Sequence, residues 1–430
     1  MAIINKIKSL VQHQGFRRYA ANTSWMMAEQ MLRIVAGLLV GIWVARYLGP
    51  EQFGLFSYVL AFTAIFAGIA KLGLDGILVR ELINHPQGRD VYLGTAFWLK
   101  VIGAFVVMAI MAAVVPFTSN DSTTNLYIFI ITAGLVFQSF EVVEFYFQSK
   151  VLAKIVSICK VTQLILSSLI KIYLVVTQAE LFWFVFVTAF DTFSLGVSYF
   201  VAYKIRGNVS FFKCFNISIA KQLLKDSWPL IFSAFSVGLA MRIDQIMISE
   251  FQGDYEVGIY SAGVRLAEGL AILAVVVSTS LYPMIIKRVY SKSYNDIKIL
   301  IRAGFYGLIF LAAIVAFLSS EIIFLLFGME YKESDAVLAI LIFSIPFTYL
   351  NIITSKVLTA ENKAADVMWR QFALLLINVS LNFILIPKYG VIGAAIATLL
   401  SDLIISVFMD IIFKRNRVFG LLKVKAIIGW

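Results

Sequence analysis

The chain has 430 residues, of which 61% are hydrophobic and only 14% are charged, and its mean hydropathy is +0.90. In soluble globular proteins about a quarter of the residues are charged. This composition excludes an ordinary soluble protein and predicts that lipid surrounds most of the chain. The formal net charge of +11 then indicates basic loops that set membrane orientation rather than a nucleic-acid partner.

The N-terminal segment is basic and only weakly apolar. Its first 22 residues carry Lys6, Lys8, Arg17 and Arg18 but lack a long apolar core and a small-residue cleavage site. We therefore expect no cleavable signal peptide. The segment predicts a basic, amphipathic arm that lies on the cytoplasmic surface of the membrane.

Apolar runs of membrane-spanning length follow one another along the rest of the chain. They predict an all-α polytopic membrane protein with twelve transmembrane helices in two six-helix bundles around a central cavity. The expected helices cover residues 24–47, 53–73, 91–115, 126–147, 155–177, 181–203, 227–249, 257–283, 300–320, 336–356, 367–386 and 390–413. The expected domains are 1–203 with the basic arm, a cytoplasmic linker at 204–226, and 227–430 with a basic tail.

The basic residues between these spans are distributed very unevenly. Only Lys332 and Lys388 fall in the outer loops, and the others fall on the side of the N-terminus. By the positive-inside rule, both termini are expected in the cytoplasm. The outer loops run to roughly a dozen residues at most, which leaves no room for a folded outer domain.

The two halves of the chain share a short internal repeat. Residues 47–57 read YLGPEQFGLFS, and residues 251–261 read FQGDYEVGIYS, so that Gly49 aligns with Gly253 and Gly54 with Gly258. Because each half holds six spans, both halves enter the membrane in the same sense. The repeat is therefore parallel, as in transporters that rock one half against the other around a central site.

Three segments together resemble a known family. They are ARYLGPEQFGLFSYVLAF with KLGLDGILVRE near the N-terminus, MRIDQIMISEFQGDYEVGIYSAGVRL in the centre, and IPKYGVIGAAIATLLSD near the C-terminus. In this order they resemble the polysaccharide-repeat (O-antigen) flippases of the Wzx type, within the multidrug/oligosaccharidyl-lipid/polysaccharide exporter superfamily.

This resemblance implies that the protein turns an undecaprenyl-pyrophosphate-linked oligosaccharide from the cytoplasmic to the periplasmic leaflet by alternating access. It implies a lipid-linked oligosaccharide and membrane lipids as partners, together with a polysaccharide polymerase and a chain-length regulator. No nucleic acid, cofactor or metal is expected.

Two pairs of charges lie inside the expected spans at helical spacing. Glu29 and Arg33 are four residues apart, and Arg265 and Glu268 are three apart, so each pair shares a helix face. An internal ion pair that lowers the cost of insertion explains them as well as a role in transport does. In transport the arginines would hold the pyrophosphate, and Glu29 and Glu268 would be their charge partners.

Other intramembrane charges have no local partner. Arg242 and Asp244 point to different sides of their helix, and each needs a partner on another helix or in a cavity. Lys100 is a further candidate for substrate binding. Asp191 and Asp402 are candidates for ion coupling, with a structural salt bridge as the alternative. Glu141 and Glu144 lie near a helix end and are expected to be solvated.

The candidate substrate-binding set is therefore Arg33, Lys100, Arg242 and Arg265. The candidate ion-coupling residues or charge partners are Glu29, Asp191, Asp244, Glu268 and Asp402. Arginine suits a pyrophosphate because its planar fork donates two hydrogen bonds to one phosphate.

No phosphate-binding loop, nucleophile elbow or zinc-helix motif occurs in the sequence. We therefore expect no enzyme. Three alternatives to the flippase remain open. They are a multidrug or cation exporter of the same superfamily, a membrane glycosyltransferase or polymerase, and a structural scaffold for polysaccharide assembly.

Overall fold

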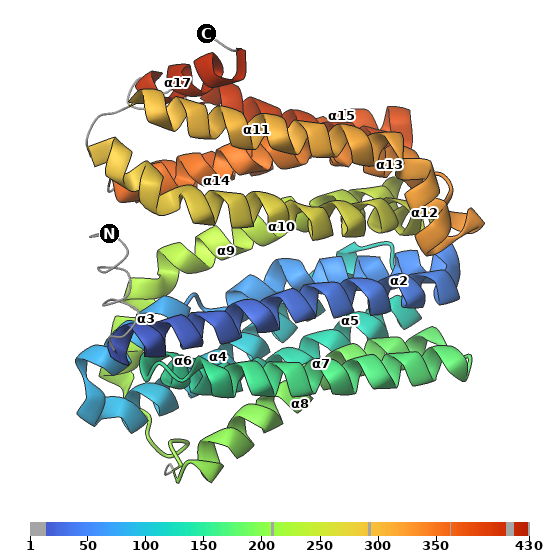
Figure 1. Cartoon of the computed structure of the whole chain (residues 1–430). Helices are drawn as coiled ribbons and strands as arrows, with labels where there is room; N and C mark the ends of the chain where they lie inside the picture. The colour runs from blue at the N-terminus through green and yellow to red at the C-terminus, as the bar shows by residue number, and fades with distance from the viewer. Residues whose placement is uncertain (1–13, 208–209, 291–293, 362, 410–416, 429–430) are drawn as a thin grey trace. The chain divides into compact units, whose positions relative to one another are not determined.

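The computed structural model describes residues 14–207, 210–290, 294–361, 363–409 and 417–428. Within these residues the chain is helical and contains no β-strand (Figure 1). This confirms the all-α class. The expected N-terminal arm lies largely outside the described residues, as does the part of the basic tail at 410–416.

Ten segments of the described chain are long and apolar enough to cross a bilayer. Two helices, α2 (Gln14–Lys71) and α15 (Ala364–Leu403), are too long for one crossing of a ~30 Å hydrocarbon core at 1.5 Å per residue. Each contains one glycine with non-helical backbone angles, Gly49 in α2 and Gly390 in α15. Each helix thus covers two of the expected spans, and the total of twelve stays a prediction.

The chain forms two compact units. Unit 1 comprises Met1–Gly41 and Thr63–Phe235, and unit 2 comprises Ile42–Phe62 and Ser236–Trp430. Helices α2 and α9 (Ile217–Gln252) therefore contribute to both units. The domain boundaries expected at residues 203 and 227 remain a prediction.

Unit 1 is built around an aromatic core. Its remaining elements are α3 (Asp75–Asn84), η1 (Pro86–Gly88), α4 (Arg89–Val114), η2 (Val115–Phe117), α5 (Ser122–Gly134), η3 (Leu135–Phe140), α6 (Glu141–Ser149), α7 (Ala153–Val176) and α8 (Leu181–Ile205). The stretch expected as a linker packs onto this unit. Phe211 is fully buried, its ring meets that of Phe97, and the Trp98 indole donates a 2.8 Å hydrogen bond to the Phe212 carbonyl.

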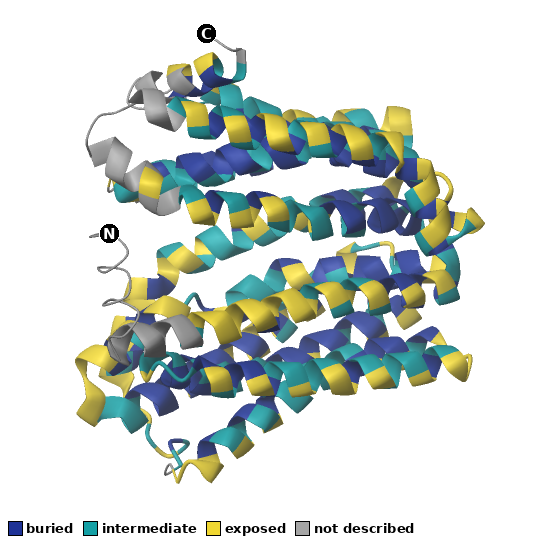
Figure 2. Ribbon diagram, viewed as in Figure 1, coloured by how far each residue is buried: buried dark blue, intermediate teal, exposed yellow. Residues whose placement is uncertain are grey.

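Unit 2 is arranged around α14 (Ser344–Ala360), which packs against α10 (Asp254–Tyr290), α11 (Tyr294–Phe317) and α15 (Figure 1). In Figure 2, dark-blue buried residues dominate α14, whereas α11 alternates between buried and exposed positions. The other elements are α12 (Ser319–Phe327), η4 (Met329–Tyr331), α13 (Ser334–Leu341), the π-turn η5 (Ile404–Phe408) and α17 (Arg417–Ile428).

The outer faces of the unit 2 helices are strongly apolar. Phe310, Ile314 and Phe317 of α11 are 70%, 42% and 84% exposed. An exposed apolar stripe of this kind in a helix of spanning length is suited to lipid, where its exposure carries no hydrophobic cost. With the candidate spans, it identifies a multi-pass membrane protein.

Candidate functional site

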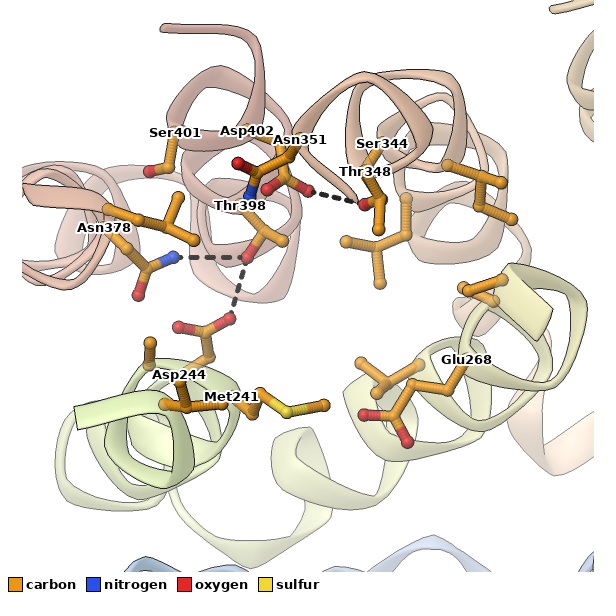
Figure 3. Close-up of a pocket in the computed structure, with 18 of the residues that line it drawn as sticks. Met241, Asp244, Glu268, Ser344, Thr348, Asn351, Asn378, Thr398, Ser401 and Asp402 are labelled. Atoms are coloured by element: carbon orange, nitrogen blue, oxygen red, sulfur yellow. Dashed lines mark hydrogen bonds between the residues drawn. The ribbon is translucent and has the colours of Figure 1, made fainter. Parts of the chain in front are cut away.

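A cavity of about 310 Å³ in unit 2 lies between α9, α10, α14 and α15. Asp244 and Glu268, from α9 and α10, face it from one side (Figure 3). Thr348, Asn351, Thr398 and Asp402, from α14 and α15, face it from the other. Three of the sequence-predicted acids, Asp244, Glu268 and Asp402, thus line one cavity.

Asp244 is the most enclosed of these acids, with 6% of the residue exposed. Its carboxylate accepts hydrogen bonds from the Tyr260 hydroxyl (2.8 Å), the Thr398 hydroxyl (2.8 Å) and the Asn382 amide (2.6 Å). Asn378 hydrogen-bonds two of these donors. Its amide donates to the Thr398 hydroxyl at 3.4 Å (Figure 3), and its side-chain oxygen accepts from the Asn382 amide at 3.0 Å. These three donors to the buried Asp244 carboxylate are neutral, and the side chains around it supply several oxygen atoms.

Asp402 occupies a separate position in the same cavity. Its carboxylate accepts a 3.3 Å hydrogen bond from the Thr348 hydroxyl of α14. Thr398 and Asp402 are four residues apart on α15, so both project from the same helix face. Two of the carboxylates in the cavity, Asp244 and Asp402, therefore accept hydrogen bonds from hydroxyl groups.

Arg242 and Glu268 form an ion pair between α9 and α10, with 3.2 Å between Nη1 and Oε1. The expectation that Arg242 needs a partner on another helix is confirmed. Glu268 also interacts electrostatically with Arg265, its neighbour on α10, so one carboxylate serves both arginines. The Arg265 guanidinium lies 5.7 Å above the centre of the Phe53 ring, a cation–π contact within unit 2.

The remaining candidates lie in unit 1 and do not converge on one cavity. Glu29 and Arg33 pair at 3.2 Å, as their spacing predicts. The Lys100 ammonium is buried and sits 2.7 Å from the Glu141 carboxylate, with the Phe145 ring 5.0 Å away. The charge of Lys100 is therefore already balanced by an acid, and its proposed role in substrate binding stays a prediction.

The other unit 1 acids are also held in ion pairs. Asp191 pairs with Lys171 at 2.8 Å, which is the structural alternative considered for it. Glu144 accepts from Lys160 at 2.7 Å and from the Tyr199 hydroxyl at 2.6 Å. The expectation that Glu141 and Glu144 are solvated was wrong, because lysines of α4 and α7 form ion pairs with them.

Sequence reasoning missed the hydroxyl groups of the cavity. Tyr260, Thr348 and Thr398 were not singled out, although each donates to a cavity carboxylate. One signal was available for Thr398, which lies four residues before Asp402 on a single helix face. Within the described residues, no group of three or more His, Cys, Asp or Glu side chains is arranged to hold a metal ion.

The sequence matches two known protein-family models and several relatives. The family model described as "Polysaccharide biosynthesis protein" matches residues 19–289, and the model described as "MatE" matches residues 229–384. The chain is 24% identical over 406 residues to the "Capsular polysaccharide biosynthesis protein CapF" of Staphylococcus aureus, covering 92% of this chain and 99% of that protein. It is 25% identical over 405 residues to the "Probable flippase AglR" of Haloferax volcanii, covering 89% and 81%.

Solved structures share the fold. An "inward-facing conformation of a multidrug resistance MATE family transporter of the MOP superfamily" superposes with a TM-score of 0.67 at 16% identity, covering 94% of this chain and 98% of that one. The structure "Lipid II flippase MurJ, inward closed conformation" superposes with a TM-score of 0.65 at 15% identity, covering 94% and 89%.

Proposed function

The chain belongs to the polysaccharide biosynthesis protein family, and from this premise we propose that it is a flippase for a lipid-linked oligosaccharide. In this proposal it carries an undecaprenyl-pyrophosphate-linked repeat from the cytoplasmic to the periplasmic leaflet of the bacterial inner membrane, with both termini in the cytoplasm. Membrane lipids, a polymerase and a chain-length regulator are its proposed partners, and the chain itself makes and breaks no bonds.

The observation that carries the proposal is the position of two arginines. Arg242 and Arg265 lie inside candidate membrane spans on α9 and α10. A charge at mid-membrane costs ~2.5–3.5 kcal/mol on insertion scales, so such residues are retained where they serve a pathway. A pyrophosphate is a dianionic group that two guanidinium forks match in both charge and geometry.

The ion pair between Arg242 and Glu268 suits a binding site that must also release its ligand. Both side chains are partly accessible, at 28% and 41%. In the absence of substrate Glu268 neutralises the arginine, and an arriving pyrophosphate competes for it. Because both side chains remain partly accessible, a ligand can reach the arginine without entering a fully buried ion pair.

The acid-lined cavity is assigned to a coupling ion. At about 310 Å³ it lies at the lower end of the volumes of small-molecule sites and is small for an oligosaccharide. Asp244, with the oxygens of Thr398, Asn378 and Asn382 around it, would take a proton or a small monovalent cation. Ion binding at Asp244 would then shift the equilibrium between the two transport states.

The test is loss of the gene in its host, scored by the leaflet that holds the lipid-linked repeat. We expect repeats to accumulate in the cytoplasmic leaflet and surface polymer to be lost. The intact gene should restore both, and variants with Arg242→Gln and Arg265→Gln together should not. Absence of the lipid-linked repeat itself would point to synthesis and refute the proposal, as would restoration by the double variant at normal membrane abundance.

A cation exporter of the same superfamily is the second candidate. The observation that favours it is the cavity with three carboxylates, two of which, Asp244 and Glu268, lie in the region matched by the MatE model. It predicts that deletion leaves surface polymer intact and changes tolerance to cationic dyes. The Asp244→Asn variant would then abolish dye export, whereas substitution of the arginines would not.

A further inference from the structure

The helix that carries Asp402 ends at Leu403 and is followed by the π-turn η5 (Ile404–Phe408). In η5 the Met409 amide donates to the Ile404 carbonyl, five residues back, so the turn contains one residue more than an α-helical turn. Such insertions leave backbone carbonyl groups that the helix does not satisfy by itself. Two of the carbonyls in this turn accept from buried cationic side chains.

Arg370 of α15 supplies the first contact. It is 2% exposed, and its guanidinium donates to the Ile405 carbonyl at 3.3 Å and to the Asn351 side-chain oxygen at 3.0 Å. Asn351 lines the acidic cavity. Arg370 therefore joins the π-turn to the cavity wall on α14.

Lys423 of α17 supplies the second contact. It is fully buried, and its ammonium donates to the Ser406 carbonyl at 2.6 Å and to the Thr354 hydroxyl at 2.9 Å. Thr354 lies three residues after Asn351 on α14, on the same helix face. A buried ammonium is costly unless polar groups surround it, so the chain retains Lys423 here against a substantial desolvation penalty.

The helix that carries Lys423 is fixed at its far end as well. Arg302 of α11 donates to the carbonyls of Lys425 (3.4 Å) and Ala426 (3.1 Å), and the Tyr306 hydroxyl donates to the Ile427 carbonyl (2.5 Å). These are last-turn carbonyls, which an α-helix leaves without internal partners and which a cation stabilises. α17 is thus a docked element of unit 2.

From these contacts we propose that α17 is a latch that sets the direction of Asp402, with Lys423 and Arg370 as positioning residues. The extra residue of a π-turn can move along its helix, and each residue in an α-helix turns by about 100°. By binding the carbonyls of Ile405 and Ser406, the two cations keep the extra residue after Asp402. If it moved before Asp402, Leu403 would take the place of Asp402 at the cavity and Asp402 would turn away.

Thiol labelling measures this rotation without any transport assay, so its outcome is separate from that of the proposed function. Single cysteines are placed as Asp402→Cys or Leu403→Cys in a chain whose Cys159 and Cys214 are replaced by serine. The labelling rates with a small methanethiosulfonate reagent are compared in membranes, with and without Lys423→Met. We expect the ratio of the rate at 402 to the rate at 403 to fall about tenfold, the population shift that accompanies loss of the charge-assisted hydrogen bond from Lys423 to the π-turn.

The matched control is Lys425→Met, which removes an exposed lysine from the same helix and should leave the ratio unchanged. A Thr348→Cys reporter on the opposite wall of the cavity should label equally in both backgrounds. An unchanged 402-to-403 ratio in Lys423→Met at normal membrane abundance would overturn the proposal. If Lys423→Met does not accumulate, Arg370→Gln removes the other cation that binds the π-turn, and the same ratio decides in the same way.

Discussion

Gly54 and Gly258, which the internal repeat aligns, contact each other's segments reciprocally within unit 2. A Cβ atom on Gly54 would overlap the Asp254 carbonyl oxygen, and a Cβ atom on Gly258 would overlap the Pro50 carbonyl oxygen. Pro50 and Asp254 are themselves related by the repeat offset. Gly54 of the first segment meets Asp254 of the second, and Gly258 of the second meets Pro50 of the first. A twofold axis produces this reciprocal arrangement.

We predict that either glycine resists even the smallest substitution. Gly54→Ala or Gly258→Ala inserts a methyl group against backbone that cannot swing aside, and overpacking of this kind costs ~1–3 kcal/mol. The thermal unfolding midpoint of the detergent-purified protein should fall. The matched control is Gly307→Ala in α11, where nothing lies within 4 Å of the added atom. That variant should be neutral or more stable by up to ~1 kcal/mol, because alanine favours helix. An unchanged midpoint in Gly54→Ala would contradict the close crossing.

Asp244→Asn should impair ion-coupled transport without impairing folding. The substitution preserves shape but removes the charge that Tyr260, Thr398 and Asn382 surround. We expect normal membrane abundance, transport reduced at least about tenfold, and loss of its dependence on the coupling ion. Tyr260→Phe removes only one donor, so it should weaken the response by ~1–3 kcal/mol and not abolish it. Transport measured against cation concentration and pH gives the comparison. Full ion-dependent transport by Asp244→Asn would remove this residue from the site.

Lys100 and Glu141 should behave as a structural pair. Lys100→Met leaves a carboxylate without its partner in the interior of unit 1, and loss of one member of a buried pair costs ~3–5 kcal/mol. Lys100→Met combined with Glu141→Gln should recover most of that stability, because no uncompensated charge remains. The unfolding midpoints of the two single variants and the double variant form a mutant cycle. If the double variant folds well but does not transport, Lys100 has the substrate role first expected of it.

Asp121 offers a pH-dependent test outside the membrane spans. Its side chain accepts from the Thr124 amide at 2.8 Å and caps the first turn of α5. Hydrogen bonds from Thr124 lower the pKa of the Asp121 carboxyl. The cap is therefore fully present above the unfolded pKa of about 3.9 and is lost as the pH falls through the lower folded value. Asp121→Ala should cost ~0.5–2 kcal/mol at neutral pH. The difference from the parent chain should disappear in strong acid, and a difference that persists there would contradict this role.

Several features of the molecule follow from local sequence. A spanning helix needs only length and apolar composition, so the membrane character and most helix positions could be predicted. The repeat also singled out Gly54 and Gly258 as equivalent positions, because each half of the chain carries the same short sequence pattern. The spacing of Glu29 and Arg33 was enough to predict their pair, because neighbours four residues apart always share a helix face.

Partners across helices were decided by the tertiary structure alone. Asp244 meets Asn382 and Thr398, which are 138 and 154 residues away, and Glu268 forms an ion pair across helices with Arg242, which is 26 residues away. Such choices depend on how far each helix is rotated and shifted against its neighbours, and a shift of one residue turns a side chain by about 100°. Hydropathy does not encode that rotation. It is fixed by packing and by contacts such as that of Lys423 with the π-turn, which appear only once the helices are assembled.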